Sequence, residues 1–212
     1  MTLQTWWLYL GAVIVISATP GPNVLYVTTR SIRFGFAAAM IGMSGCLLSL
    51  TVLLVASAAG VSAFMLAVPV AFEVMKYAGA AYLIFLGIQM WRAPATLAPV
   101  VVGPSSETAG RMVGPWSLLR GGFLVGISNP KLLVFAAAFF PQFIAPDAPW
   151  APQFGLLVAT FLAVEAFFYT LYAMGGRRFA AHLLQGVWLR RFNRTSGAIF
   201  CGFGIAMLRY KP

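Results

Sequence analysis

The chain has few charged residues: Asp, Glu, Lys and Arg make up 8% of its 212 residues, and only four of them are acidic. A soluble domain carries about 25% charged residues, so this composition excludes an ordinary soluble enzyme. The hydrophobic fraction of 61% also excludes a disordered chain, which requires low hydrophobicity. The remaining class is an all-α, polytopic membrane protein.

Cysteine and histidine are scarce too, with two cysteines and one histidine in the chain. Cys46 and Cys201 lie in apolar runs without a CxxC or Cys/His spacing, so we predict no metal site, no disulfide framework and no cofactor. The net charge of +10 could suggest nucleic acid. Because the basic residues are spread between apolar runs, membrane topology explains them better, and we expect no nucleic-acid partner.

The apolar runs predict six membrane-spanning helices, since about 20 residues cross a hydrocarbon core of ~30 Å. The uncharged start is too long for a cleavable signal peptide and predicts a retained first span. A turn bracketed by Gly60 and Pro69 is expected to divide the long uncharged run of residues 34–72. The predicted spans are Trp6–Thr29, Gly35–Ala58, Phe72–Trp91, Gly121–Phe140, Pro152–Met174 and Leu189–Leu208.

The distribution of Lys and Arg predicts the orientation of these spans. If both termini lie outside, the inner segments hold ten basic residues and the outer segments hold three, namely Lys76, Arg209 and Lys211. The positive-inside rule therefore favours two periplasmic or extracellular termini.

Two of the inner segments have distinct compositions. Residues 93–119 are rich in Ala, Pro, Gly, Ser and Thr, which is typical of a flexible linker. Residues 177–194 have an apolar helical face with arginines at both ends. This pattern fits an interfacial helix on anionic lipid and a merely basic inner loop equally well.

An internal repeat relates the two halves of the chain. The segments Gly79–Arg92 and Gly197–Arg209 both begin Gly-Ala and end Gly-Ile-x-Met-x-Arg, and Pro22 and Pro130 interrupt the first and fourth spans. Because three spans is an odd number, the second copy must be inverted in the membrane, as in many secondary transporters. We therefore predict repeats at residues 1–92 and 120–212, joined by the linker. The alternative is chance similarity between apolar helices.

The segment Ala18–Asn23, with the sequence ATPGPN, interrupts the first span. Pro20 and Pro22 remove backbone donors and Gly21 weakens the helix further. In a membrane the freed groups must bind protein, water or ligand. A half-helix that starts near Pro22 directs its positive end at the break, beside Asn23, and such an end is a natural site for a substrate carboxylate. The alternative is a proline kink that serves packing only.

Asn129, Pro130 and Lys131 fall at the centre of the fourth span. A cation at this depth costs on the order of 3 kcal/mol or more on insertion scales. Lys131 therefore needs a carboxylate, freed carbonyl groups or water as its partner. The alternative to a substrate-binding role is a structural ion pair.

Glu165 is the second mid-membrane charge, near the centre of the fifth span. Tyr169 and Tyr172 follow on the same helical face. Such a carboxyl group can carry a proton or bind an ammonium, and Lys131 is its simplest charge partner. A static pair with Lys131 is again the alternative.

Two further pairs are interpreted as structural. Glu73 and Lys76 are spaced to pair at the outer end of the third helix, where they could support structure or gating. Gly122 and Gly126 predict close helix packing, and they could contribute to a possible homodimer.

These motifs together resemble the LysE family of amino-acid exporters, especially its homoserine/threonine-efflux branch. The matching stretches are Ala18–Asn23, Phe72–Gly87 and Asn129–Phe143. The resemblance implies six helices, a bacterial inner-membrane location and export of amino acids or derivatives, coupled to the proton gradient, rather than an enzyme activity. It carries functional roles over to Pro20, Gly21, Pro22, Asn23, Asn129, Pro130, Lys131 and Glu165, where Glu replaces the Asp of some members.

The resulting hypothesis is alternating access around a midplane site between the repeats. The first-helix break and Lys131 would hold the substrate carboxylate, and Glu165 would meet the ammonium or a proton. Two other classes stay open. One is a channel or exporter for another small metabolite or ion, and the other is a membrane thiol oxidoreductase that uses Cys46 and Cys201.

Overall fold

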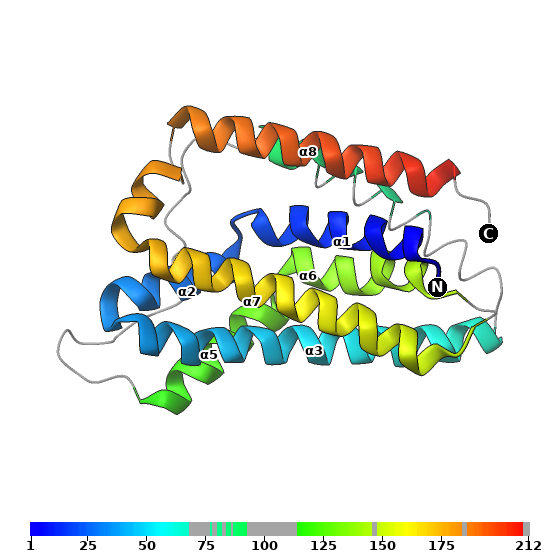
Figure 1. The fold of residues 1–212 in the computed structure, drawn as a ribbon, viewed down its shortest axis with the longest axis horizontal. Coiled ribbons are helices and arrows are strands. Elements are labelled where there is room, and N and C mark those ends of the chain that lie inside the picture. Colours follow the sequence, from blue (N-terminus) through cyan, green and yellow to red (C-terminus); the bar gives the residue numbers. More distant parts are fainter. Residues whose placement is uncertain are drawn as a thin grey trace.

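The computed structural model describes residues 1–67, 77, 80–81, 84–85, 87–92, 114–145, 148–183 and 186–209, and every regular element in them is a helix. The prediction of an all-α chain is thus confirmed for this part (Figure 1). The elements are α1 (Leu3–Ala18), α2 (Pro22–Phe34), α3 (Phe36–Ala67), α5 (Pro115–Ile127), α6 (Pro130–Val134), the π-helical turn η1 (Phe135–Phe139), the 3₁₀ turn η2 (Phe140–Phe143), α7 (Trp150–Leu183) and α8 (Gly186–Arg209).

Two of these helices, α3 and α7, are each long and apolar enough to cross a membrane. Two bent pairs raise the number of candidate spans to four if each pair is one span: α1 with α2, and α5 with the helical stretch that starts at Pro130. The predicted spans Phe72–Trp91 and Leu189–Leu208 stay predictions.

The candidate span of α3, Phe36–Ala59, agrees with the predicted span Gly35–Ala58, but the helix itself is longer than expected. Helix α3 does not turn near Gly60 but continues through it to Ala67. A glycine inside a helix costs only about 1 kcal/mol, and no proline occurs before Pro69 to interrupt the backbone ladder. Pro69, Glu73, Lys76 and residues 93–113 of the predicted linker lie outside the described residues.

The predicted basic segment 177–194 is helical in its described parts. Helix α7 runs past the expected end of its span at Met174 to Leu183, and α8 begins at Gly186. The segment is therefore divided between two helices, and its contact with lipid stays a prediction.

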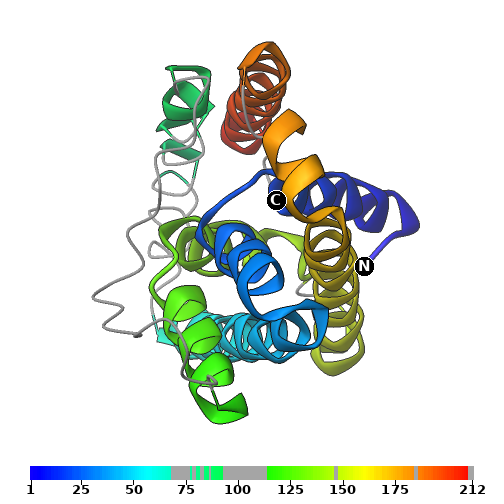
Figure 2. The ribbon, with the colours of Figure 1, turned by 90° about the vertical axis from the view of Figure 1, so that its left-hand side faces the viewer.

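The described helices run back and forth along one long axis. The beginning of α1 and the end of α8 lie at the same end of the molecule (Figure 1). Seen along that axis, α1, α2, α3, α5, α6 and α7 form a cluster, while α8 and the segment that contains residues 87–92 lie together at its edge (Figure 2). Helix α8 also contacts α1 and α7.

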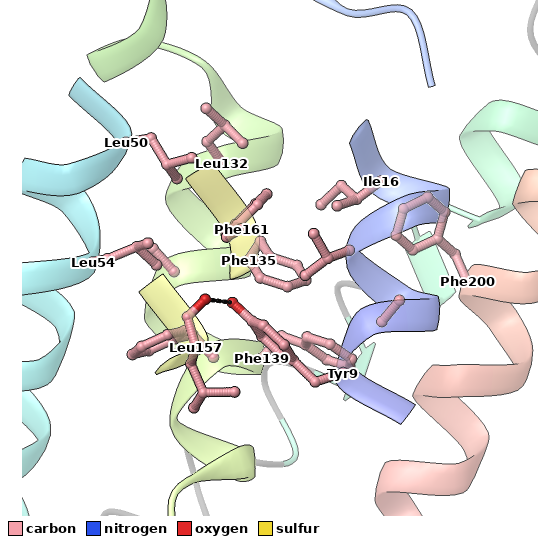
Figure 3. Close-up of a cluster of buried hydrophobic side chains, with 14 of the residues drawn as sticks. Tyr9, Ile16, Leu50, Leu54, Leu132, Phe135, Phe139, Leu157, Phe161 and Phe200 are labelled. Atoms are coloured by element: carbon pink, nitrogen blue, oxygen red, sulfur yellow. Dashed lines mark hydrogen bonds between the residues drawn. The ribbon is translucent and has the colours of Figure 1, made fainter. Parts of the chain in front are cut away.

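An aromatic core holds α1 against the second half of the chain (Figure 3). The Tyr9 ring of α1 packs edge-on against Phe143, with ring centroids 5.1 Å apart, and its hydroxyl donates to the Leu157 carbonyl oxygen at 3.0 Å. Phe135 and Phe161 extend the cluster toward α3. This packing fixes where α1 ends relative to α6 and α7, and so fixes the position of the chain break described below.

Glycines bring α3 and α5 into close contact. A Cβ atom at Gly122 would collide with the Gly42 carbonyl oxygen, and one at Gly126 would collide with the Ser49 side chain. The predicted packing role of the two glycines is confirmed. Their partner, however, is α3 of the same chain, so the suggestion that they contribute to a homodimer is wrong: both are buried within one molecule.

A second glycine contact joins α8 to the segment that contains residues 80–92. Gly87 faces Gly197 and Cys201, while Gly204 faces Ala80 and Ile84. As residue numbers rise along the segment of residues 80–92, the numbers of the residues that it contacts on α8 fall. The two segments are therefore antiparallel. Gly87 and Gly204 occupy matching positions in the two copies of the Gly-Ile-x-Met-x-Arg motif.

We expect Gly204→Leu to destabilise the protein strongly, because its side chain would have to enter the space of Ile84 and the Ala80 carbonyl group. Gly202→Leu is the matched control, since a Cβ at Gly202 meets no atom within 4 Å. Thermal unfolding in detergent should show a loss of about 1–3 kcal/mol for the first variant and little change for the second. Equal losses would contradict the contact.

Candidate functional site

The first helix is broken at the predicted position. Helix α1 ends at Ala18, α2 begins at Pro22, and their axes differ by 51°. In an α-helix each N–H bonds the carbonyl oxygen four residues earlier. Since proline has no N–H, Pro20 leaves the carbonyl of Ile16 free and Pro22 leaves that of Ala18 free.

Side chains from the second half of the chain bind these freed carbonyl groups. The Lys131 Nζ donates to the Ile16 oxygen at 2.8 Å and to the Thr19 oxygen at 3.1 Å. The Tyr172 hydroxyl donates to the Ala18 oxygen at 2.8 Å. The sequence allowed three kinds of partner for Lys131, and in the structure its ammonium group binds backbone carbonyl groups at the break.

Gly21 lies beside the end of the Lys131 side chain. A Cβ atom at Gly21 would lie 3.4 Å from the Lys131 Nζ. The backbone at Gly21 is extended, with φ −134° and ψ −172°, which any residue can adopt. Neither the space beside the ammonium group nor the dihedral angles therefore requires glycine at this position.

The fourth span is broken in the same manner. Helix α5 ends at Ile127, α6 begins at Pro130, and the two parts differ by 57°. Asn129 caps the restarted helix, since its Oδ1 accepts from the Lys131 backbone N–H at 3.1 Å. This cap orients the first turn of α6, which carries the Lys131 side chain.

A chain of hydrogen bonds connects the two breaks to α7. The Asn129 Nδ2 donates to the Asn23 Oδ1 at 3.1 Å, and the Asn23 Nδ2 donates to the Tyr169 hydroxyl at 2.9 Å. All three side chains are buried. Asn23 is in the first turn of α2 and Asn129 caps α6, so the positive ends of two half-helices lie close to each other.

Glu165 lies one helical turn before Tyr169 and is 1% exposed. The Tyr169 hydroxyl interacts with its side chain. Among the described residues, however, no group donates a hydrogen bond to the Glu165 Oε1. The direct ion pair with Lys131, which the sequence analysis left open, is not formed, because the Lys131 ammonium is held at the end of α1 instead.

The structure thus brings the sequence-predicted site residues together at one place. Pro20, Gly21, Pro22 and Asn23 form one break, Asn129, Pro130 and Lys131 form the other, and Tyr169, Tyr172 and Glu165 share a face of α7. Sequence reasoning missed Ile16 and Ala18, whose carbonyl groups are bound. Counting four residues back from each proline would have identified both.

No group of three or more His, Cys, Asp and Glu side chains suited to a metal ion occurs in the described ranges. The arrangement presents hydrogen-bonding groups, one lysine and one carboxyl group. It can bind a small polar molecule and exchange a proton.

We expect Asn129→Ala to lower stability by about 1–2 kcal/mol, because it removes the cap of α6 and leaves Asn23 without a donor. Ser44→Ala is the control: its hydroxyl donates only to the carbonyl of Met40, one turn earlier on an exposed helix face. Melting temperatures in detergent would test this, and an unchanged value for Asn129→Ala would contradict the network.

The LysE type translocator family matches residues 14–211 of the chain, a range that contains both breaks and Glu165. The chain belongs to the LysE family. The family is one of translocators rather than of enzymes. The resemblance seen in the sequence motifs is therefore confirmed.

Several bacterial relatives of this LysE-family chain cover almost its whole length. The homoserine/homoserine lactone efflux protein of Salmonella typhi is 33% identical over 200 residues, which is 94% of both chains. An uncharacterized membrane protein of Vibrio cholerae is 29% identical over the full length of both. The leucine efflux protein of Salmonella choleraesuis is 28% identical over 93% of this chain and 92% of its own. No solved structure matches.

Proposed function

We propose that this LysE-family chain exports amino acids or close derivatives across the bacterial inner membrane and couples their export to proton entry. The observation that carries the proposal is Glu165, a buried carboxyl group beside two broken helices. Ionisable side chains inside a membrane are expensive and typical of substrate or proton pathways. The efflux relatives support amino acids as the cargo.

In this proposal the chain has six spans in two inverted repeats, with both termini on the periplasmic side. Three observations support it: the two proline breaks, the antiparallel contact of matching glycines Gly87 and Gly204, and the start of α1 at the same end as the finish of α8 (Figure 1). Rocking of one repeat against the other would then expose the site alternately to the two sides.

The break at α2 supplies the anchor for the oxygen-bearing end of the substrate. Helix α2 begins at Pro22, and its N-cap residue, Gly21, has no side chain to cap it. The N–H groups of its first turn have no partners within the helix, and they carry the positive end of its dipole. An oxygen of the substrate can accept hydrogen bonds there, with Asn23 and Tyr169 alongside.

Glu165 provides the coupling. When the carboxyl group is ionised it binds the substrate ammonium, and when it is protonated it does not. Protons and substrate thus compete for one group. If the site loads substrate on the inside and a proton on the outside, each transport cycle moves them in opposite directions.

Amino-acid efflux from cells loaded with mixed dipeptides tests this function. Cells that produce the protein should release one or a few amino acids faster than empty-vector cells, and a protonophore should remove the difference. Homoserine and leucine should be measured first, because two relatives are named as efflux proteins for them. If no amino acid leaves faster although the protein is folded and in the membrane, the proposal is wrong.

The two alternative classes have less support. Cys46 is buried on α3 beside α5, whereas Cys201 lies on α8 against Gly87, and both thiols are free. The described structure therefore offers no dithiol pair. A channel would give flux that neither saturates nor responds to pH, so the same efflux assay distinguishes it from a carrier.

A further inference from the structure

The two charged side chains of the site differ in what they already bind. The Lys131 ammonium donates to the oxygens of Ile16 and Thr19, at the negative end of α1. The Glu165 side chain is 1% exposed, and its Oε1 accepts no hydrogen bond from the described residues. The Lys131 ammonium thus already has hydrogen-bond partners, whereas one oxygen of the Glu165 carboxyl group has none among the described residues.

The charged and titratable groups around Glu165 come from three helices. The Lys131 ammonium of α6 and the neutral Cys46 thiol of α3 lie near it without a hydrogen bond to it, and Tyr169 on α7 is its hydrogen-bonding neighbour. A buried carboxylate oxygen without a donor is unfavourable. A proton or an incoming ammonium group would remove this cost, and the ammonium brings three N–H donors.

A substrate carboxylate, in contrast, would find the Lys131 ammonium already hydrogen-bonded to the protein. To pair with it, the ammonium would have to leave the two carbonyl groups that Pro20 and the helix end expose. Those groups would then be left without donors inside the protein. The N–H groups at the start of α2 accept a carboxylate, but they bond the neutral carbonyl oxygen of an ester, amide or lactone as well.

We infer that the site recognises the ammonium group of its substrate and does not require a free carboxylate. This inference rests on the proposed function and narrows it: the substrate class is primary amines of amino-acid form, with the carboxyl group free or masked. The name of one relative, the homoserine/homoserine lactone efflux protein of Salmonella typhi, joins two molecules that share the amine and differ in the free carboxylate.

Competition in energised everted membrane vesicles tests the inference, because an exporter accumulates substrate in them. Labelled homoserine and leucine are the reporter substrates. One competitor group keeps the amine and masks the carboxylate, as in homoserine lactone and leucinamide. The other masks the amine and keeps the carboxylate, as in N-acetylhomoserine and N-acetylleucine. A pH-sensitive dye verifies that no competitor dissipates the proton gradient, and a slightly acidic medium keeps the amines protonated.

We expect the carboxyl-masked compounds to inhibit about as well as the parent amino acids, and the N-acetyl compounds to need about tenfold higher concentrations or more. Glu165→Asp keeps the carboxylate and should retain this order. Strong inhibition by the N-acetyl compounds, with none by the amides and lactone, would overturn the inference but leave amino-acid export intact. If neither label accumulates above empty-vector vesicles, the proposed function falls and the inference falls with it.

Discussion

Glu165→Gln is expected to abolish proton-coupled export and still give a folded protein in the membrane. The amide has the shape of the acid but neither binds nor releases a proton, and it offers no charge to an ammonium group. The Glu165 Oε1 accepts no hydrogen bond within the described ranges, so the substitution should cost little stability. Efflux from dipeptide-loaded cells should fall to the level of empty-vector cells.

Glu165→Asp is the matched control, since it keeps the titratable group but shortens the side chain by one methylene. It should retain part of the export activity and its dependence on external pH. Membrane abundance and detergent gel filtration identify any variant that misfolds. Normal gradient-driven export by the Gln variant would contradict the coupling mechanism, because the chain would then move protons without this carboxyl group.

The positions of the two helix breaks could be predicted from the sequence because they depend on local chemistry. Pro20, Pro22 and Pro130 each lack an N–H, so each removes one backbone hydrogen bond from the interior of a continuous span. The face shared by Glu165 and Tyr169 likewise follows from helical periodicity. The structure agrees with the sequence at all of these positions.

The partners of the buried charges could not be predicted in the same way. Opposite charge favoured pairing Lys131 with Glu165, but the choice of partner depends on where α1 ends relative to α6 and α7. That position is set by packing around Tyr9, between residues far apart in the sequence. The end of α3 was misjudged for a different reason, since Gly60 only weakens a helix whereas a proline interrupts it.

Lys131→Met is expected to have the second large effect, on stability as well as on export. Methionine has a similar length but no donor, so the oxygens of Ile16 and Thr19 lose the hydrogen bonds that satisfy them. Each carbonyl left without a donor in the interior costs about 1–3 kcal/mol. The variant should unfold at a clearly lower temperature in detergent, whereas Arg190→Met, at an exposed position on α8, should not.

A second substitution determines whether the carbonyl of Ile16 is the cause. The Thr19 N–H already bonds the Val15 oxygen at 3.2 Å, but Thr19 itself is extended, with ψ 117°, the conformation that a following proline favours. Without that proline Thr19 can adopt helical angles, and the next N–H along the chain then meets the Ile16 oxygen. Pro20→Ala supplies that N–H. In the Lys131→Met background it should therefore recover part of the lost stability, which a double-mutant cycle measures as a coupling between the two sites. Additive effects would mean that Lys131 stabilises the break by its charge alone, and recovery would show that the lysine replaces the donor that proline removed.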